Sequence, residues 1–318
     1  MSWNLSGKRI WVAGHRGMVG SAVVRRLVSE DCHVITAGRD AVDLTRQAEV
    51  EAWMAETRPD AIVMAAAKVG GILANDSYPV DFLLQNLQIE TNIAAAAHAS
   101  DVDRFLFLGS SCIYPKLAPQ PMKEAHLLTG PLEPTNEWYA IAKIAGIKLM
   151  QAYRKQYGRD WISAMPTNLY GPGDNYDLQG SHVLPALIRK FHEAKLSGAR
   201  EVVVWGSGTP LREFMHCDDL ADALVFLLQH YSEDEHINVG SGTEISIGDL
   251  AMLIADVVGY HAEIVFDSSK PDGTPRKLMD SQRLHDLGWN GGQSLRDGIA
   301  DAYKHYRATT DALEGSAA

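Results

Sequence analysis

The stretch RIWVAGHRGMVGSAVVRRL, residues 9–27, carries the clearest structural signal in this chain of 318 residues. Its first five residues form an apolar run typical of a buried strand, and apolar residues then recur at helical spacing from Gly17 to Glu30. Glycines stand at positions 14, 17 and 20 of the turn between them. Such glycines allow a tight turn, a close approach of the backbone to a pyrophosphate, and close packing of the helix on the sheet. The spacing differs from the common GxGxxG, and glycines kept only for packing are the alternative, but the flanking strand and helix favour a dinucleotide-binding turn.

The same alternation continues through the first half of the chain. Strand-like runs lie at residues 9–13, 33–37, 61–65, 104–108 and 161–165, and helical patterns at 17–30, 47–56, 79–100 and 138–157. Repeats of strand, helix and strand pair in parallel through right-handed crossovers. The sequence therefore predicts an α/β fold with a doubly wound parallel-sheet Rossmann domain over residues 1–170. The alternation loosens after Pro166, so we expect residues 171–318 to form mainly a smaller α/β substrate-binding lobe, with some segments returning to the Rossmann domain.

Composition and charge exclude several classes of protein. The chain is 46% hydrophobic and 22% charged, which is typical of a globular protein with a substantial core. Its 29 Lys and Arg against 40 Asp and Glu give a formal charge of -11, which argues against nucleic acid or an anionic membrane as the partner. There is no secretory signal pattern at the start and no apolar run of membrane-spanning length. Three widely spaced cysteines make a disulfide framework or a cysteine-based metal site improbable, and we expect a reduced, cytoplasmic location.

Arg39 indicates which dinucleotide is bound. A site for NAD places an acidic side chain near the end of the second strand, whereas here that strand runs into Thr36-Ala37-Gly38-Arg39. A basic group at this place suits the 2′-phosphate of NADP, so residues 1–170 are expected to bind NADP(H). A solvated surface arginine is the alternative, and the neighbouring Asp40 leaves the preference open to test. Asp43 and Leu44 follow, where a carboxylate can meet the adenine amino group or simply stabilise a turn.

A tyrosine and a lysine four residues apart give the chain a candidate acid and base. Tyr139 and Lys143 lie in one helical pattern, so their side chains project from the same face. An ammonium group nearby favours the phenolate and makes the phenol usable in proton transfer. A lone YxxxK is weak, but this one follows a strand that ends in Gly109-Ser110-Ser111-Cys112, which places a hydroxyl at the carboxyl edge of the sheet.

These motifs together resemble the extended, nucleotide-sugar branch of the short-chain dehydrogenase/reductase superfamily, and the combination looks like the GDP-L-fucose synthase family. The resemblance runs from Arg9 to about Tyr306. It is carried by residues 14–20 (GHRGMVG), 65–71 (AAAKVGG), 108–115 (LGSSCIYP), 134–143 (PTNEWYAIAK), 166–172 (PTNLYGP), 204–214 (VWGSGTPLREF) and 270–277 (KPDGTPRK).

The resemblance implies a bifunctional enzyme acting on GDP-4-keto-6-deoxy-D-mannose. Epimerisation at C3 and C5 would be followed by NADPH-dependent reduction at C4. The 4-keto group acidifies both neighbouring C–H bonds, and Ser110 and Tyr139 would hydrogen-bond the enolate. Cys112 resembles the family's epimerisation base and His182 the matching acid, whereas a buried structural thiol and a helix-start histidine are the alternatives. Lys143 would tune Tyr139 and contact the nicotinamide ribose. The family also implies a homodimer, formed by the two long helices at about 79–100 and 138–157.

The expected site residues fall into three groups, and no metal is implied. The catalytic residues are Ser110, Cys112, Tyr139, Lys143 and His182. The cofactor is expected to contact Gly14, His15, Arg16, Gly17, Met18, Val19, Gly20, Arg39, Asp43, Leu44, Leu108, Gly109, Ser110, Ser111, Tyr139, Lys143, Pro166, Thr167, Asn168, Leu169 and His182. The substrate is expected to contact Lys190, Trp205, Arg212, Asp272 and Lys277. The family commonly has Arg at the position of Lys190, and lysine loses the bidentate geometry of that group.

Two other functions fit parts of this pattern. A GDP-L-colitose-type enzyme would use the same residues on a dideoxy sugar and epimerise only C5, and few contacts distinguish the two substrates. A non-catalytic NADP-binding regulator would keep the fold without the chemistry. The joint presence of the five catalytic candidates opposes the second alternative.

Overall fold

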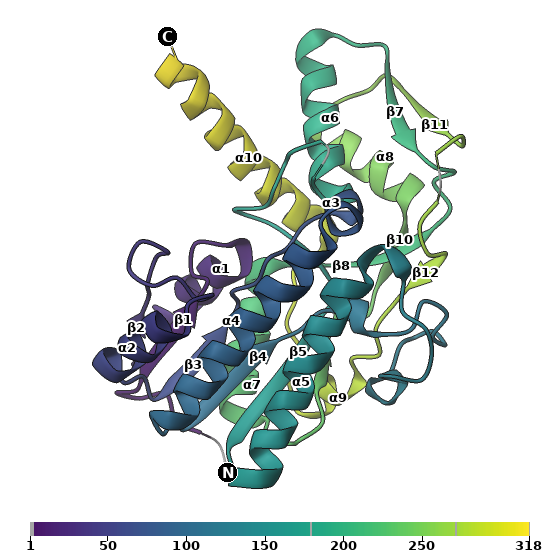
Figure 1. Cartoon of the computed structure of the whole chain (residues 1–318). Coiled ribbons are helices and arrows are strands. Elements are labelled where there is room, and N and C mark those ends of the chain that lie inside the picture. The colour runs from purple at the N-terminus through teal and green to yellow at the C-terminus, as the bar shows by residue number, and fades with distance from the viewer. Residues whose placement is uncertain (1–2, 179, 271, 318) are drawn as a thin grey trace.

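A six-stranded parallel sheet organises the computed structural model, which describes residues 3–178, 180–270 and 272–317 (Figure 1). The strand order is β2-β1-β3-β4-β5-β9, and every neighbouring pair in it is parallel. The strands are β1 (Arg9–Ala13), β2 (His33–Ile35), β3 (Ala61–Met64), β4 (Arg104–Leu108), β5 (Asp160–Pro166) and β9 (Ile237–Val239). The predicted doubly wound Rossmann sheet is confirmed. Its strand order reverses between β1 and β3, the place where such sheets bind nucleotides.

Helices cover both faces of this sheet, which explains why its strands are apolar throughout. In β1, Ile10 and Val12 belong to one core, and Trp11 and Ala13 to the other. The first core is closed by α1 (Met18–Leu27) and α7 (Cys217–His230). The second core is closed by α2 (Gln47–Thr57), α4 (Pro79–Ala99) and α5 (Glu137–Tyr157). The long helices α4 and α5 pack side by side on the second face (Figure 1).

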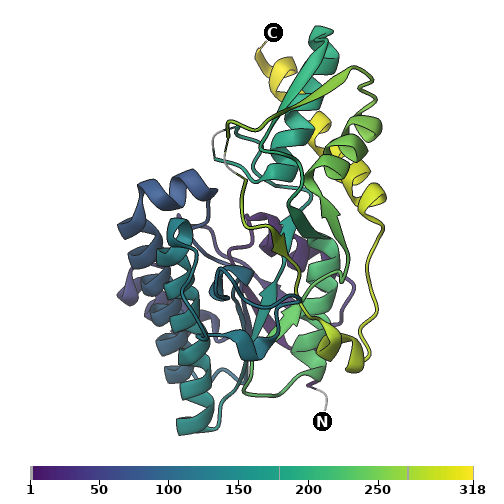
Figure 2. The same ribbon diagram turned by 90° about the vertical axis from the view of Figure 1, so that its right-hand side faces the viewer.

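A smaller α/β lobe lies beyond one end of the sheet, above it in Figures 1 and 2. It contains a sheet of β6 (Asn168–Tyr170), β8 (Leu211–His216), β10 (Glu244–Ser246) and β12 (Arg276–Lys277), and a pair formed by β7 (Glu201–Trp205) and β11 (Glu263–Asp267). Its helices are α6 (Val183–Ser197), α8 (Ile247–Val258) and α10 (Leu295–Ala317). A third core, separate from the two around the large sheet, holds these elements together.

The chain crosses between the lobe and the large sheet several times. After β8 it returns through α7 and β9, and then re-enters the lobe at β10. Glu213 of β8 is fully buried, and its hydrogen bonds hold together segments that connect the lobe and the large sheet. Its carboxylate accepts hydrogen bonds from the backbone N–H of Gly242 at 2.8 Å and of Met279 at 3.0 Å. The remaining short elements are α3 (Ile72–Ser77), α9 (Gln282–Asp286) and 3-10 turns at Ser111–Ile113, Glu124–His126 and Pro134–Asn136.

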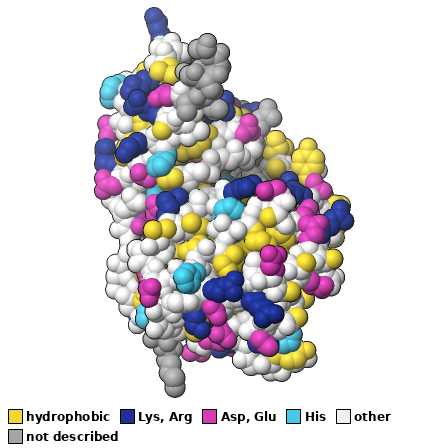
Figure 3. Space-filling view, turned by 90° about the vertical axis from the view of Figure 1, so that its left-hand side faces the viewer, with side chains coloured by type: hydrophobic (Ala, Val, Ile, Leu, Met, Phe, Trp, Pro, Cys, Tyr) yellow, Lys and Arg dark blue, Asp and Glu magenta, His cyan; other side chains and the backbone are white. Residues whose placement is uncertain are grey.

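The surface carries both signs of charge. Acidic and basic side chains are interspersed on the face shown in Figure 3, and hydrophobic side chains gather near the middle of that face. Within the described part of the chain, no helix is both long and apolar enough to cross a membrane.

Helix α5 packs closely against strand β4 at Gly146. A Cβ added to Gly146 would overlap the ring of Phe107. We therefore expect Gly146→Ala to destabilise the protein, because overpacking costs about 1–3 kcal/mol and outweighs the gain of up to about 1 kcal/mol in helix propensity. Denaturant unfolding measures the change. Gly248→Ala in α8 is the control, since its Cβ would make only ordinary contacts at 3.4 Å or more. A Gly146→Ala variant as stable as the Gly248→Ala variant would contradict the account.

Candidate active site

The turn after β1 has the shape that its glycines predict. Gly14 has a φ of +87°, and a Cβ on it would lie 2.7 Å from the backbone of Ala66. A Cβ on Gly20, in the first turn of α1, would overlap the carbonyl oxygen of Gly14. Gly17 precedes α1 directly, and a Cβ there would meet nothing closer than 3.5 Å. Gly14 and Gly20 therefore shape the turn, while Gly17 leaves space in front of the amides at the start of α1. Met18, Val19 and Gly20 form that start.

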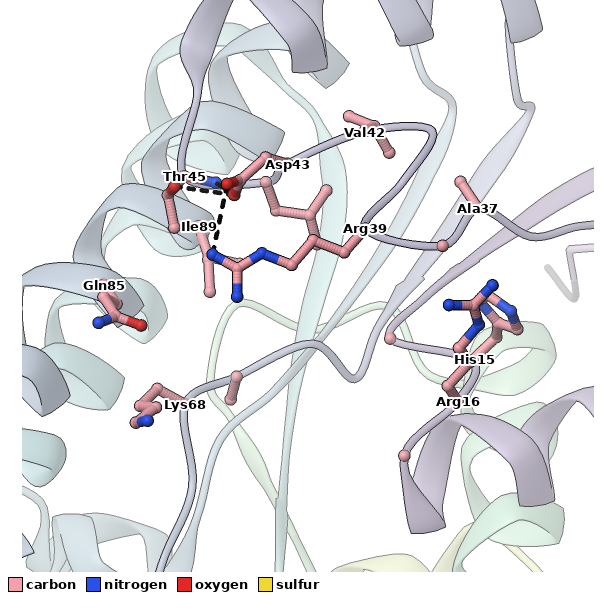
Figure 4. Close-up of a pocket in the computed structure, with 15 residues that line it drawn as sticks. His15, Arg16, Ala37, Arg39, Val42, Asp43, Thr45, Lys68, Gln85 and Ile89 are labelled. Carbon is pink, nitrogen blue, oxygen red and sulfur yellow. Dashed lines mark hydrogen bonds and ion pairs between the residues drawn. The ribbon is translucent and has the colours of Figure 1, made fainter. Parts of the chain in front are cut away.

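A hollow of about 300 Å³ opens beside this turn (Figure 4). Sequence analysis placed seven of its lining residues here: Gly14, His15, Arg16, Gly17, Arg39, Asp43 and Leu44. It did not single out Ala37, Gly38, Val42, Thr45, Ala67, Lys68, Gln85 and Ile89, which also line it. Lys68 lies in the AAAKVGG motif, but Gln85 and Ile89 come from α4 and carry no local signal. The hollow lies at the point where the strand order of the sheet reverses.

Two arginines stand at this hollow. Arg39 is 80% exposed, and its guanidinium lies 3.4 Å from a carboxylate oxygen of Asp43 (Figure 4). Arg16 approaches Asp40 at 3.3 Å. Asp43 also accepts hydrogen bonds from the backbone N–H and the hydroxyl of Thr45, at 3.0 and 2.8 Å, and these bonds together with Arg39 lower the pKa of Asp43. Asp43 is therefore a carboxylate, and the exposed Arg39 can bind an anionic group.

Tyr139 and Lys143 project from α5 toward the end of β4. Lys143 is 2% exposed, and its Nζ lies 4.8 Å from the centre of the Phe107 ring and 5.9 Å from the centre of the Tyr139 ring. The ring of Tyr139 meets Phe82 edge to face. Burial raises the pKa of Tyr139 well above its ordinary value, the negative charges that Cys112 and Glu90 carry when they are ionised add to this rise, and a hydrogen bond with Ser110 opposes it. Tyr139 is therefore a neutral phenol that can donate a proton.

Lys143 has a buried partner that sequence analysis missed. Its Nζ lies 3.0 Å from Oε1 of Glu90 in α4, a side chain that is 1% exposed. Burial raises the pKa of Glu90 above its ordinary value, and the charge and contact of Lys143 offset part of that rise. A glutamate within an amphipathic helix ordinarily faces solvent, so the sequence gives no signal for this contact. The sequence predicted Lys143 as a cation beside Tyr139, and the structure adds its counter-charge.

Lys277 acts on the pKa of both Cys112 and His182, while burial lowers the pKa of Lys277 itself and Cys112 raises it. Ser110 caps the 3-10 turn that holds Cys112, and its Oγ accepts the Cys112 N–H at 3.4 Å. Burial raises the pKa of the Cys112 thiol, while Lys277 lowers it. Desolvation and the charge of Lys277 lower the pKa of His182, the residue that precedes α6. In the ligand-free protein Cys112 is therefore a thiol and His182 a neutral imidazole.

The expected substrate contacts fall into two places in the lobe. Lys190 donates to the carbonyl of Val203 at 3.0 Å, and its Nζ lies 5.3 Å from the centre of the Trp205 ring. Both residues line a hollow of about 430 Å³, and Trp205 is 63% exposed. Arg212 and Lys277 are paired in register on β8 and β12, and the charge of Asp272 acts on Arg212.

Asp272 itself is held by protein contacts. Its carboxylate accepts the backbone N–H and the hydroxyl of Ser207 at 2.9 and 2.7 Å, and these bonds lower its pKa. It therefore fixes the loop after Trp205.

The ends of β4 and β5 hold the remaining predicted cofactor contacts. Leu108 ends β4 and Gly109 follows it directly, a Cβ on Gly109 would overlap Met165, and Ser111 is buried in the following turn. Pro166 ends β5, and Leu169 packs against the first core. Thr167 and Asn168 donate to the backbone carbonyl of Glu213 at 3.4 and 2.8 Å. These two side chains therefore tie the sheet edge to the lobe.

A parallel sheet whose strand order reverses at a glycine turn, together with a buried tyrosine and lysine one helical turn apart on α5, is typical of dinucleotide-dependent enzymes of the epimerase/reductase class. Residues 10–240 match the model of the NAD dependent epimerase/dehydratase family. The chain belongs to that family and, within it, to the GDP-L-fucose synthases.

Relatives of known name cover nearly the whole chain. The GDP-L-fucose synthase of Sinorhizobium fredii is 64% identical over 95% of this chain and 96% of its own length. That of Escherichia coli is 54% identical over 98% and 100%, and the GDP-L-colitose synthase of Yersinia pseudotuberculosis is 37% identical over 94% and 97%. Among solved structures, MlghC, a GDP-mannoheptose C4 reductase from Campylobacter jejuni with NADP bound, is 34% identical and matches 95% of this chain and 98% of its own with a TM-score of 0.87.

The glycine turn can be tested with two matched substitutions. Gly14→Ala is expected to lower stability, because Gly14 has a positive φ and its Cβ would press on Ala66. Gly17→Ala is expected to leave stability unchanged and to weaken NADPH binding at least tenfold, because its methyl group occupies the space in front of the amides at the start of α1. Thermal unfolding and NADPH fluorescence titration measure the two effects. Unweakened NADPH binding by Gly17→Ala would contradict this use of the turn.

Proposed function

We propose that this protein converts GDP-4-keto-6-deoxy-D-mannose into GDP-L-fucose, by epimerisation at C3 and C5 followed by NADPH-dependent reduction at C4. The proposal depends on two neighbouring groups of residues that can transfer protons. One group is Tyr139 with Ser110 and Lys143. The other is Cys112 and His182, both of which are affected by the charge of Lys277. A reductase alone needs only the first group. The 64% identity to a GDP-L-fucose synthase over 95% of the chain supports the same substrate, whereas identity to the colitose synthase is 37%.

The residues around the glycine turn fit NADP(H). Gly14 and Gly20 allow the tight turn, and Gly17, whose Cβ would meet nothing closer than 3.5 Å, leaves the start of α1 open to a pyrophosphate. Arg39 would bind the 2′-phosphate, and Asp43 would accept a hydrogen bond from the adenine amino group. When bound, the cofactor supplies the hydride for C4. Residues 1–170 thus serve mainly the cofactor and residues 171–318 mainly the sugar nucleotide.

Epimerisation uses the acidity that the 4-keto group gives to C3 and C5. Cys112, as thiolate, removes a proton from one face of the sugar, and Ser110 and Tyr139 hydrogen-bond the oxygen of the enolate. His182 must first take up a proton to become an imidazolium, and it then returns that proton on the opposite face; solvent restores the imidazolium before the second carbon reacts. Because burial raises the pKa of Cys112 and Lys277 lowers it, Lys277 increases the fraction of thiolate available for this step.

Reduction needs a proton at the C4 oxygen. Tyr139 provides it, since its raised pKa keeps it protonated at neutral pH. Lys143 lies beside the ring and would contact the ribose of the cofactor. The 4-keto group thus serves both reactions: it acidifies the carbons during epimerisation and accepts the hydride afterwards.

Binding of an anionic GDP group by an acidic protein requires local positive charge. Lys190 and Trp205 line one hollow of the lobe, where the indole can stack on a base and the ammonium can meet a phosphate. Arg212 and Lys277 stand side by side on β8 and β12 and can neutralise the diphosphate. Asp272 holds the loop between these two places.

The assembly is proposed to be a homodimer in the cytoplasm. Large apolar side chains are exposed on the two long helices, with exposed fractions of 67% for Val80, 50% for Leu84 and 41% for Trp138. Pairing of α4 and α5 with a second copy would cover them. All three cysteines, Cys32, Cys112 and Cys217, are free thiols, which suits a reducing compartment.

Product analysis in deuterated water tests the reaction. Incubation with GDP-4-keto-6-deoxy-D-mannose and NADPH is expected to give GDP-L-fucose with deuterium at both C3 and C5, because each carbon exchanges its proton through the enolate. NMR of the product reads both positions. Deuterium at C5 alone would indicate a colitose-type epimerisation, and product formed without NADPH consumption would refute the reduction.

The influence of Lys277 on Cys112 predicts a pH dependence. Solvent exchange at C3 and C5 is expected to rise with pH as the Cys112 thiol ionises. Lys277→Gln should shift this rise to higher pH by about one unit, because a nearby positive charge favours the thiolate. Lys277→Arg keeps the charge and is the matched control, with its rise near the wild-type pH. Identical profiles for Lys277→Gln and the wild type would mean that Lys277 serves the diphosphate alone.

A further inference from the structure

The ion pair between Glu90 and Lys143 is an unusual feature of the site, since both partners lie inside the protein. The two side chains are 1% and 2% exposed, and Lys143 Nζ lies 3.0 Å from Glu90 Oε1. Among the described residues, Lys143 is the only cation within ion-pair distance of Glu90. The pair joins the two long helices directly, since Glu90 belongs to α4 and Lys143 to α5.

Stability alone does not explain such a pair. Moving two charges out of water costs several kcal/mol for each ion, and their attraction often only offsets this cost, so apolar side chains of similar size serve folding equally well. The neighbours on α4 show that apolar residues are accommodated here, because Ile89 and Ile93 are buried in the same core. A function in the site is the more economical explanation.

The charges around Tyr139 suggest what this function is. Tyr139 is faced by Ser110 at the end of β4, by Cys112 in the following turn, by Lys143 one helical turn along α5, and by Glu90 from α4. Lys277 acts electrostatically on Cys112 and on His182. A lone ammonium beside a phenol favours the phenolate, whereas a carboxylate close behind the ammonium cancels much of that effect.

We propose that Glu90 is a positioning residue that fixes the Lys143 ammonium and keeps Tyr139 a neutral phenol, so that the site is set to give a proton to the substrate. The inference rests on the proposed reduction, in which Tyr139 protonates the C4 oxygen. The charge of Glu90 indeed contributes to the raised pKa of Tyr139. A site without this carboxylate would hold more phenolate at alkaline pH, and the phenolate has no proton to give.

Glu90→Gln tests the proposal, because it removes the charge and keeps the size. The alkaline loss of NADPH oxidation with GDP-4-keto-6-deoxy-D-mannose is expected to move to lower pH by on the order of one unit, with a larger change in kcat than in KM. Glu124→Gln is the matched control: Glu124 is also a buried carboxylate, but it accepts a hydrogen bond from the Asn238 N–H away from Tyr139. A Glu90→Gln profile that coincides with those of Glu124→Gln and the wild type would overturn the proposal.

Titration of Tyr139 itself gives a readout that needs neither substrate nor cofactor. The phenolate absorbance of each protein, minus that of the same protein carrying Tyr139→Phe, is expected to appear at lower pH in Glu90→Gln than in the wild type. An unchanged titration would overturn the role of Glu90 even if the enzyme is active, whereas a shifted titration in a protein that does not reduce the keto sugar would overturn the proposed function instead. If Glu90→Gln does not fold, Glu90→Asp replaces it. Its carboxylate is drawn back from Lys143, so a lower rate with intermediate titration is expected, and wild-type rate and titration would overturn the proposal.

Discussion

The buried carboxylate of Glu213 is the constraint on which the geometry of this enzyme depends. Its side chain accepts two backbone N–H groups, one from the segment between β9 and β10 and one from the segment between β12 and α9, and its own carbonyl accepts the side chains of Thr167 and Asn168 where β5 passes into β6. The sheet edge, the lobe strand β8 and the strand that carries Lys277 are thereby joined at one point. This joint matters because the proposed catalytic groups come from both sides of it. Tyr139 and Lys143 in α5 and Cys112 in the turn after β4 belong to the domain of the large sheet, and His182 and Lys277 belong to the lobe.

Burial away from water determines the protonation states of Tyr139, Cys112 and His182 before epimerisation and reduction begin. Burial raises the pKa values of Tyr139 and Cys112 and lowers that of His182, so the ligand-free protein holds a phenol, a thiol and a neutral imidazole at these positions. Reduction uses the phenol as it stands. Epimerisation first requires a thiolate at Cys112 and an imidazolium at His182, a change that amounts to moving one proton from Cys112 to His182. Lys277 favours the thiolate, whereas the lysine beside Tyr139 is balanced by Glu90. The two lysines therefore act differently. Lys277 lowers the pKa of Cys112, whereas the charge of Lys143 is largely neutralised by Glu90.

Much of this arrangement follows from local sequence. The glycine turn, the parallel sheet, the YxxxK pair and the serine at the end of β4 are predictable because each depends on residues a few positions apart and on the rule that carboxyl ends of parallel strands share one edge. Glu90, Lys68 and Gln85 could not be predicted in this way. Glu90 and Gln85 lie at the site because of how α4 packs, and Lys68 because of the path of a loop. A charged or polar residue in a helical pattern ordinarily indicates a face exposed to solvent. The burial of Glu213 could not be predicted for the same reason. A glutamate in a strand pattern ordinarily indicates a surface carboxylate, and Glu213 is buried only because segments distant in the sequence pack around it.

The central claim is that one sugar position serves both reactions between the sheet edge and the lobe. A crystal structure of the Cys112→Ser variant with NADPH and GDP-4-keto-6-deoxy-D-mannose tests it most directly. The account predicts the 4-keto oxygen within hydrogen-bonding distance of Ser110 and Tyr139, with residue 112 and His182 on opposite faces of the sugar ring and Lys277 near the diphosphate or residue 112. A keto oxygen remote from Tyr139, or both residue 112 and His182 on the same face of the ring, would contradict it.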